Sequence, residues 1–340
     1  MQSVYSEGFL ATLQQAGLSV FLTMPLCGIV AVLRADGDCL NTHLAEFRKP
    51  TGLAVQNDRM VLATLNQVVE FRNVPDACNR LTEHRDACFL PRSSSWTGNV
   101  LSHELGIAGD DVVFVNTQFS CVARRSSRFN FVPIWMPPFL TRSIPGDCCH
   151  LNGLALRDGA PRYATALGES DIPGGWRENA IDGGVVIDIQ ANEVLSRGLS
   201  MPHSPRWHNN ELWLLQSGTG GLGKIDLRSG GYEEMIRLPG FTRGLSFHGN
   251  LAFVGVSSVR DRAYFGAALK NGESMNRCGV WIIEATSATV LGMLEFVNPD
   301  ELFAVEVLSG VKSPEIINMD NTLIDSVFQF PANSTLVGVG

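Results

Sequence analysis

Residues 51–66 read TGLAVQNDRMVLATLN, a short apolar run, a polar turn and a second apolar run that ends on polar residues. The same arrangement returns at 103–118, 152–168, 204–218 and 243–257, and the stretch ELFAVEVL at 301–308 resembles a sixth start. Short apolar runs bounded by Gly, Asn, Asp and Pro are typical of paired β-strands. The chain is therefore built from a repeated β-hairpin.

The spacing of these hairpins identifies the kind of repeat. Their first strands align on one position each: Leu53, Leu105, Leu154, Arg206, Leu245 and Val305. These positions lie 39 to 60 residues apart, which matches a four-stranded propeller blade and is too long for a solenoid repeat. Outer-strand candidates fill the intervals, as at 184–188 and 279–283. We predict an all-β fold, a six-bladed β-propeller.

The N-terminal region predicts one short helix followed by strands. Tyr5–Ala16 places apolar residues on one face and is followed by Gly17, a typical helix stop. The apolar stretch 18–33 is interrupted by Pro25 and Gly28 and is too short to span a bilayer. We expect it to form buried strands that close the last blade and so remove an open sheet edge.

Three regions follow from this pattern. We expect an N-terminal helical segment (1–17), the propeller (18–314) and a C-terminal tail (315–340) that packs on the propeller or on a partner. Because the tail is apolar, it is also a candidate contact surface for a homo-oligomer.

Composition excludes several classes of function. The chain has 26 Lys and Arg against 34 Asp and Glu, a net charge of −8, which predicts no nucleic-acid partner. No basic segment precedes the apolar stretch, so no signal peptide and no membrane association are expected. Eight scattered cysteines without a CxxC pair predict free thiols and a cytoplasmic location. The glycine-rich segment 217–223 connects two strands and opens no helix, so we expect a turn and no nucleotide cofactor.

Three long stretches carry a family resemblance. They are HLNGLALRDGAPRYATALGESDIPGGWREN at 150–179, LSMPHSPRWHNNELWLLQSGTGGLGKIDL at 199–227 and LPGFTRGLSFHGNLAFVGVSSVR at 238–260. They resemble a bacterial family of conserved hypothetical proteins, distantly similar to the six-bladed gluconolactonase and regucalcin superfamily. The resemblance implies the fold and no particular activity. Family members tend to carry an acidic residue where this chain has Ala304.

Histidines precede three of the predicted inner strands. Because inner strands begin at one rim of a propeller channel, His103, His150 and His203 are expected to meet there. Three neutral imidazoles suit a divalent transition metal such as Zn, Fe, Mn or Cu. We predict that these three residues are metal ligands. The alternative for each is a hydrogen-bonded structural role.

Other polar and aromatic residues fall near the same rim. The catalytic candidates, three acid/base groups and one cation, are Glu301, Glu306, Glu104 and Arg243. The substrate-binding candidates are Arg206, Asn152, Trp176 and Trp207. The arginines have an alternative as ion-pair partners of Glu301 or Glu104, since a guanidinium stays charged. The tryptophans have an alternative in blade packing, and polar second-strand ends such as Thr117 and Ser217 are interpreted as partners of neighbouring backbone groups.

These expectations favour one function and leave a second open. The first is a metal-dependent enzyme, whether oxidase, hydrolase or lyase, that acts on a small-molecule or peptide ligand at the channel mouth. The second is a non-catalytic propeller that serves as a protein-binding platform or assembly subunit. Sugar-lactone hydrolysis, implied only by the superfamily resemblance, is the weakest reading.

Overall fold

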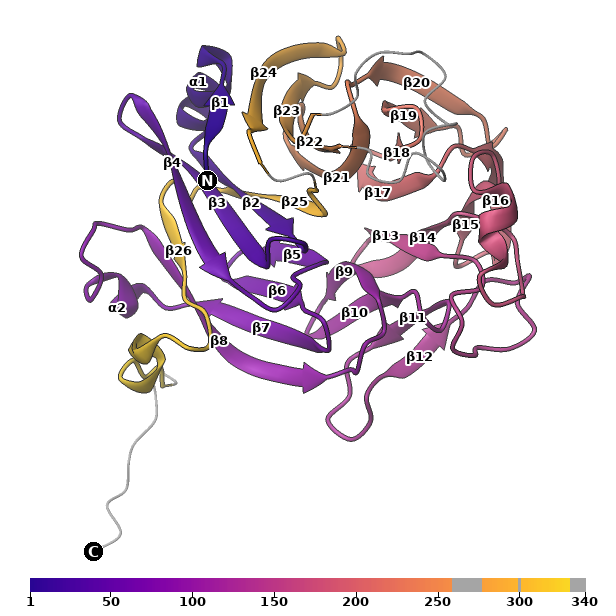
Figure 1. Ribbon diagram of the computed structural model, residues 1–340, viewed down its shortest axis with the longest axis horizontal. Helices are drawn as coiled ribbons and strands as arrows, with labels where there is room; N and C mark the ends of the chain where they lie inside the picture. The colour runs from indigo at the N-terminus through magenta and orange to yellow at the C-terminus, as the bar shows by residue number, and fades with distance from the viewer. Residues whose placement is uncertain (259–276, 299–300, 331–340) are drawn as a thin grey trace, which may run out of the picture.

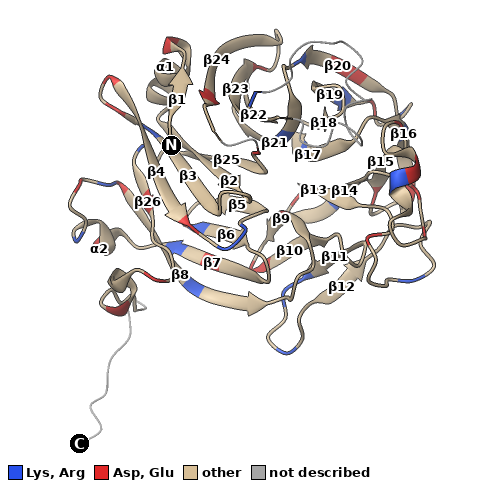
Figure 2. Ribbon diagram, viewed as in Figure 1, with Lys and Arg blue, Asp and Glu red and all other residues tan. Residues whose placement is uncertain are grey.

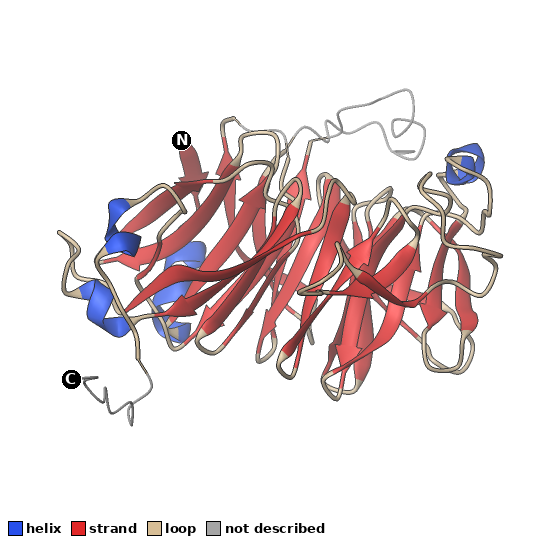
Figure 3. Cartoon of the chain, turned by 90° about the horizontal axis from the view of Figure 1, so that it is seen from below, coloured by secondary structure: helices blue, strands red, loops and turns tan. Residues whose placement is uncertain are grey.

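The fold is a closed ring of six sheets around a central axis (Figure 1), and all described strand pairs are antiparallel except that of one short edge strand. The structure is a computed structural model that describes residues 1–258, 277–298 and 301–330. Seen from the side, the strands cross the thickness of a disc and their turns gather on its two faces (Figure 3). The predicted six-bladed β-propeller is confirmed.

Each blade is a meander whose strands run from the channel outward. Blade 1 contains β5 (Leu53–Gln56), β6 (Arg59–Ala63), β7 (Gln67–Asn73) and β8 (Ala87–Trp96), with α2 (Pro75–Cys78) between its last two strands. Blade 2 contains β9 (Ser102–Ala108), β10 (Asp111–Asn116), β11 (Cys121–Arg124) and β12 (Val132–Trp135). Blade 3 contains β13 (Leu151–Arg157), β14 (Ala160–Ala166), β15 (Gly184–Asp188) and β16 (Glu193–Leu199), with the 3-10 turn η1 (Gly175–Asn179) in its second connection.

Blades 4 to 6 are built in the same way, and the N-terminal strands β1 to β4 join blades 5 and 6. Blade 4 contains β17 (Pro202–His208), β18 (Glu211–Gln216), β19 (Gly221–Ile225) and β20 (Tyr232–Arg237). Blade 5 contains β21 (Phe241–His248), β22 (Leu251–Ser257), β23 (Gly279–Glu284) and β24 (Thr289–Phe296), with β1 (Ser3–Tyr5) on its outer edge. Blade 6 combines the C-terminal β25 (Ala304–Ser309) with β2 (Leu18–Met24), β3 (Ile29–Asp36) and β4 (Cys39–Glu46).

Small residues in the inner strands allow the blades to approach one another closely. A Cβ on Gly52 would lie 2.4 Å from the carbonyl oxygen of His103 in the next blade. A Cβ on Gly153 would lie 2.4 Å from the ring of Pro205, again in the next blade. The recurring small residue of the sequence pattern is therefore a packing requirement at the blade junctions. The apolar faces bury their side chains in clusters between neighbouring blades.

The N-terminal strands close the ring, as predicted. β2 pairs with β25, placing Leu22 opposite Val305 and Phe21 opposite Glu306. The expected N-terminal helix is α1 (Glu7–Ala16), capped by the Ser6 side chain at its start and by left-handed Gly17 at its end. It packs against β24, β3 and β2.

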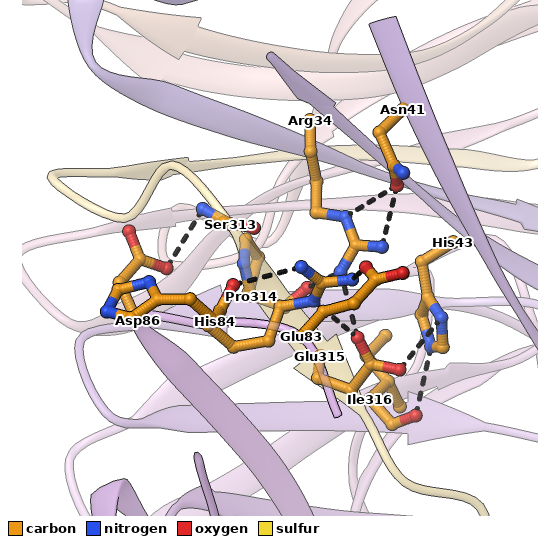
Figure 4. A network of polar contacts seen from close by, with 11 residues as sticks. Arg34, Asn41, His43, Glu83, His84, Asp86, Ser313, Pro314, Glu315 and Ile316 are labelled. Atoms are coloured by element: carbon orange, nitrogen blue, oxygen red, sulfur yellow. Dashed lines mark hydrogen bonds and ion pairs between the residues drawn. The ribbon is translucent and has the colours of Figure 1, made fainter. Parts of the chain in front are cut away.

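A second contact fastens the ring outside the channel. Beyond β25, the short strand β26 (Pro314–Ile316) adds in parallel to the outer edge of β8, and so crosses from blade 6 to blade 1. The carboxylate of Glu315 accepts hydrogen bonds from Arg34 and Arg85 at 2.9 Å each, and lies 3.1 Å from Nδ1 of His43 (Figure 4). His43 lies on β4 and is mostly buried.

The described part of the C-terminal tail packs on blade 1. After β26 comes the 3-10 turn η2 (Thr322–Asp325), and Ile317 and Val327 join the apolar cluster around α2. Residues 331–340, on which the predicted oligomer contact partly depends, lie outside the described residues. Among the described residues, no helix combines the length and apolar character needed to cross a membrane.

Candidate functional site

One rim of the channel is formed by the segments that lead into the inner strands. Several of these segments contain a non-glycine residue with positive φ: Leu101, Asp147, His150 and Met201, at 50° to 52°. Such backbone conformations are costly and persist where surrounding contacts hold them, often at functional sites. The backbone of the rim is therefore held in one conformation by its surroundings, and this fixes the positions of the side chains at the mouth.

Two of the predicted histidines are held by the same pair of contacts. Nδ1 of His103 lies 2.9 Å from the Leu101 carbonyl and 2.7 Å from the Thr117 hydroxyl. Nδ1 of His203 lies 2.9 Å from the Met201 carbonyl and 2.9 Å from the Ser217 hydroxyl. Because a carbonyl only accepts, each Nδ1 carries the hydrogen, and Nε2 is left with its lone pair.

The hydroxyls that hold these histidines also join neighbouring blades. Thr117 donates to the Leu151 carbonyl at 2.6 Å, and Ser217 donates to the Thr242 carbonyl at 2.6 Å. Both contacts run from the second strand of one blade to the inner strand of the next. The interpretation of these polar strand ends as partners of neighbouring backbone groups is confirmed.

The third histidine has a carboxylate partner. Nδ1 of His150 lies 2.9 Å from Oδ2 of Asp147, which also accepts a hydrogen bond from Nε1 of Trp176 at 3.1 Å. The indole of Trp176 covers the imidazole with ring centroids 4.5 Å apart. The carboxylate and indole fix both the ring orientation and its tautomer, so Nε2 of His150 is placed as a hydrogen-bond acceptor or base.

Contacts between non-adjacent blades show that these groups share one mouth. The ring of His103 lies 4.9 Å from that of His150 and 5.1 Å from that of Phe303, which leads into blade 6. The guanidinium of Arg243 in blade 5 lies 3.6 Å from the Phe303 centroid. Arg243 also contacts Glu301 at 3.6 Å. Blades 2 and 6 are not neighbours, so their contact is made across the channel.

The electrostatics of the mouth keep two imidazoles neutral. Burial is the main cause that lowers the pKa of His103 well below its ordinary value, and the charges of His150 and Arg243 lower it further. Burial also lowers the pKa of His203, and Arg243 is the next cause. The result is a mouth in which the Arg243 guanidinium acts on two neutral nitrogen acceptors, His103 and His203.

A small cavity adjoins this mouth between blades 1 and 2. It has a volume of about 70 Å³ and is lined by His103, Phe303, Lys49 and Thr51, among others. One water needs roughly 10–15 Å³ on this measure, so the space admits several waters or a carboxylate-sized group. Lys49 adds another cation to the rim.

The described residues give no support to the predicted metal site. Among residues 1–258, 277–298 and 301–330, no group of three or more His, Cys, Asp or Glu side chains is placed to hold a metal ion. The Arg243 guanidinium lowers the pKa of two of the three imidazoles, and the same positive charge opposes a metal cation beside them. The geometry therefore gives no support to a Zn, Fe, Mn or Cu site.

Three predicted residues meet deeper in the channel instead of at the mouth. Nη2 of Arg206 lies 2.9 Å from Glu104 and 3.2 Å from Glu306, and these residues come from blades 4, 2 and 6. The ion pair with Glu104 is one of the two alternatives expected for Arg206. Burial, followed by the Glu104 charge, outweighs the guanidinium and raises the pKa of Glu306 to about 7.

The other predicted residues divide between the mouth and the blade interiors. Trp176 and Glu301 lie at the mouth, as described above. Asn152 is buried, and its side-chain oxygen accepts a hydrogen bond from Thr165 at 2.6 Å. Trp207 lies near the far end of β17, between the Arg157 guanidinium and the ring of Tyr163. The structure does not bring Trp207 to the histidines.

The sequence did not identify two residues of the mouth. Asp147 precedes His150 by three residues, a spacing that is detectable but is shared by many turns. Phe303 directly precedes the blade 6 inner strand, where its counterparts in blades 2 and 4 are His103 and His203. Phe303 lies two residues before the aligned Val305, as His103 lies two before Leu105, but an apolar side chain at that position carries no chemical signal of its own.

Comparison with solved structures supports the fold alone. A chain of the nidogen/laminin complex is 9% identical, with a TM-score of 0.54 and coverage of 86% of this chain and 98% of that one. A protein of unknown function from Bacteroides caccae is 10% identical, with a TM-score of 0.51 and coverage of 86% and 98%. Virginiamycin B lyase from Staphylococcus aureus with quinupristin is 10% identical over 82% and 92%, and its TM-score of 0.44 carries no argument.

Sequence comparison defines the family without defining an activity. No curated protein matches the chain. The family model described as a domain of unknown function, DUF4915, matches residues 7–317, which is most of the chain. The chain therefore belongs to the DUF4915 family.

Proposed function

We propose that the channel mouth binds a small carboxylate-bearing molecule and that His150 acts on it as a general base. The observation that carries this proposal is that His103, His150 and His203 share one mouth, each with Nδ1 in a hydrogen bond, and that the Arg243 guanidinium acts on the imidazoles of His103 and His203. A guanidinium matches a carboxylate in charge and geometry. Glu301 already lies 3.6 Å from this guanidinium, so the proposed ligand shares Arg243 with Glu301, and the neutral imidazoles of His103 and His203 add no further negative charge.

The proposed step at His150 is a proton transfer. Asp147 accepts the Nδ1 hydrogen and stabilises the imidazolium that forms when Nε2 takes a proton from the substrate or from an attacking water. Arg243 holds the substrate carboxylate beside this base, which supplies orientation. Trp176 covers the imidazole and limits access of bulk water.

Direct binding tests the first half of the proposal. Malonate, succinate, malate and citrate are titrated into the protein by calorimetry, and Arg243→Gln is expected to weaken the tightest of them at least tenfold. Arg157→Gln is the matched control, because Arg157 lies at the opposite end of an inner strand. Equal affinity in the Arg243→Gln variant, or no binding of any of the four, would contradict the assignment.

A substrate screen of small organic acids tests the second half. His150→Gln is expected to retain ligand affinity within threefold and to lose turnover at least a hundredfold. The metal-dependent reading remains as the second candidate, and dialysis against a chelator separates the two. Turnover that disappears on dialysis and returns with Zn, Fe, Mn or Cu would favour the metal.

A non-catalytic role is the remaining alternative. It predicts ligand or protein binding that survives in His150→Gln together with no turnover of any acid in the screen. Its support is the breadth and rigidity of the propeller faces, since the fold itself does not decide function.

A further inference from the structure

A second concave site lies on the outside of the ring, between blades 1 and 2. It is an open groove of about 1020 Å³ lined by the end of β8 and by residues 125–131, which follow β11. Blades diverge as they leave the axis, so the space between them must be filled by large side chains or stay open. Here the facing strand carries Ser93, Ser94 and Ser95, whose short side chains leave it open. β26 covers only Ala87–Phe89 of the same strand.

Two aromatic side chains are presented to solvent in this groove. Trp96 is 63% exposed and Phe129 is 59% exposed. Their backbone is held in place, because Asn130 Nδ2 donates to the Trp96 carbonyl at 3.2 Å and Phe129 N donates to the Ser126 hydroxyl at 3.0 Å. Exposed aromatics on a fixed backbone form flat apolar surfaces with little ordering cost on binding.

The charge in the groove is opposite to that of the whole chain. The Arg125 guanidinium lies between Glu70 at 2.8 Å and the Ser93 hydroxyl at 3.4 Å. The Arg128 guanidinium lies over the Phe129 ring at 5.2 Å, and no acidic side chain in the described ranges pairs with it. Among the described residues, the lining holds one carboxylate, Asp111, against the guanidiniums of Arg125 and Arg128, so the lining is net positive on a chain of net charge −8.

We propose that this groove binds an oligosaccharide that carries carboxylate groups. A sugar ring has an apolar face, which stacks on Trp96 or Phe129, and a rim of hydroxyls, which pair with the serines and Asn130. A carboxylate on the ring is recognised by Arg128. Single-stranded nucleic acid uses similar aromatic surfaces but needs a track of several cations for its phosphates, and Arg125 is already paired with Glu70.

Calorimetry with pentagalacturonate tests the proposal on the full chain. We expect saturable binding that weakens at least tenfold in Trp96→Ala and in Phe129→Ala. Both side chains are largely exposed, and an unchanged unfolding midpoint verifies that each variant folds. Phe328→Ala is the matched control, because Phe328 is 68% exposed and lies outside the groove. It is expected to leave the affinity unchanged.

A charge cycle separates stacking from carboxylate recognition. The fully methyl-esterified pentasaccharide, which keeps the rings and loses the charge, is expected to bind at least fivefold more weakly. Arg128→Gln is expected to impose the same loss on the acid and none on the ester. The proposal is overturned if neither saccharide binds, if Trp96→Ala leaves affinity unchanged, or if a decathymidylate binds more tightly than pentagalacturonate. His150→Gln should not change this binding, which makes the test independent of the channel mouth.

Discussion

At the scale of single residues, burial and hydrogen bonding set the protonation of the channel histidines. His103 and His203 have Nδ1 donating to a carbonyl and stay neutral because burial and Arg243 lower their pKa. The same residues in an unfolded chain take up a proton below about pH 6.5. The unfolded state therefore binds more protons in acid, and stability falls as pH drops below that value.

His203→Gln tests this linkage. The wild type is expected to lose stability between pH 7 and 5.5 more steeply than the variant, by up to about 1.4 kcal/mol per pH unit. At pH 7.5 the variant should itself be about 1–2 kcal/mol less stable, because a buried hydrogen bond changes. Urea unfolding at several pH values measures both effects. His84→Gln, at an exposed position, should match the wild type, and equal pH slopes in His203→Gln would contradict the argument.

Glu306 should show the opposite dependence on pH. Its pKa is raised to about 7, chiefly by burial and then by Glu104, so the folded state retains a proton that the unfolded chain releases near pH 4.5. Stability contributed by this group is present below that value and is lost as pH rises through 7. Glu306→Gln is expected to be more stable than the wild type at pH 8, by up to about 3 kcal/mol.

The comparison that isolates this effect uses urea unfolding at pH 5.5 and pH 8. The gain of Glu306→Gln should shrink at the lower pH, where the native carboxyl is already protonated. Glu104→Gln serves as the partner variant, since it also removes one negative charge beside Arg206. A Glu306→Gln gain that is the same at both pH values would exclude titration of this carboxyl as its cause.

At the scale of elements, the docking of strand β26 on blade 1 depends on one carboxylate, that of Glu315. Glu315 accepts from Arg34 and Arg85, and contacts His43, so three elements meet at one side chain (Figure 4). Removing one partner of a mostly buried ion network leaves the other charges unpaired, which typically costs about 3–5 kcal/mol. Glu315→Gln is expected to cost an amount near the lower end, since the amide oxygen still accepts one hydrogen bond.

Hydrogen exchange locates the effect of Glu315→Gln. Amides of residues 314–317 should lose protection first, while the blade 4 strands keep theirs. Glu83→Gln is the control, because Glu83 contacts the same Arg85 from an exposed position. Uniform loss of protection across all blades in Glu315→Gln would show that β26 does not open as a separate unit.

The same scale shows what the sequence could predict. The hairpin repeat predicted the number of blades, and the apolar pattern of residues 18–33 predicted the strands that close the ring, because both are local strand patterns. The sequence could not predict which charged residues lie at the mouth of the channel and which lie deeper inside it. Glu301 reaches Arg243 at the mouth, whereas Glu104 and Glu306 reach Arg206 below it. Depth depends on strand register and on the bulges between paired strands, such as the shift between His203 and Arg206, which residue types alone do not determine.

At the scale of the whole molecule, closure of the ring brings together charged groups that are far apart in the sequence. Figure 2 shows charges of both signs scattered over the blades, mostly on turns and outer strands. Arg206 of blade 4 pairs with Glu104 of blade 2 and Glu306 of blade 6, which lie 102 and 100 positions away in the sequence. Arg243, which contacts Glu301, comes from blade 5. Only a closed ring brings them together, so the candidate site and the fold are lost together if the ring opens.

Ring closure makes a prediction about cooperativity. Leu22 is fully buried in β2 and pairs with Val305 in β25, at the seam between the two ends of the chain. Leu22→Ala is expected to cost about 2–5 kcal/mol. The tryptophans are at 96, 135, 176, 207, 213 and 281, and none is in blade 6. If the seam holds the whole ring, Leu22→Ala shifts the tryptophan fluorescence and far-ultraviolet circular dichroism transitions by the same amount. Leu214→Ala, buried in blade 4, should shift the same single transition. Separate transitions for the two probes in Leu22→Ala would mean that blade 6 unfolds alone and that the channel mouth survives without it.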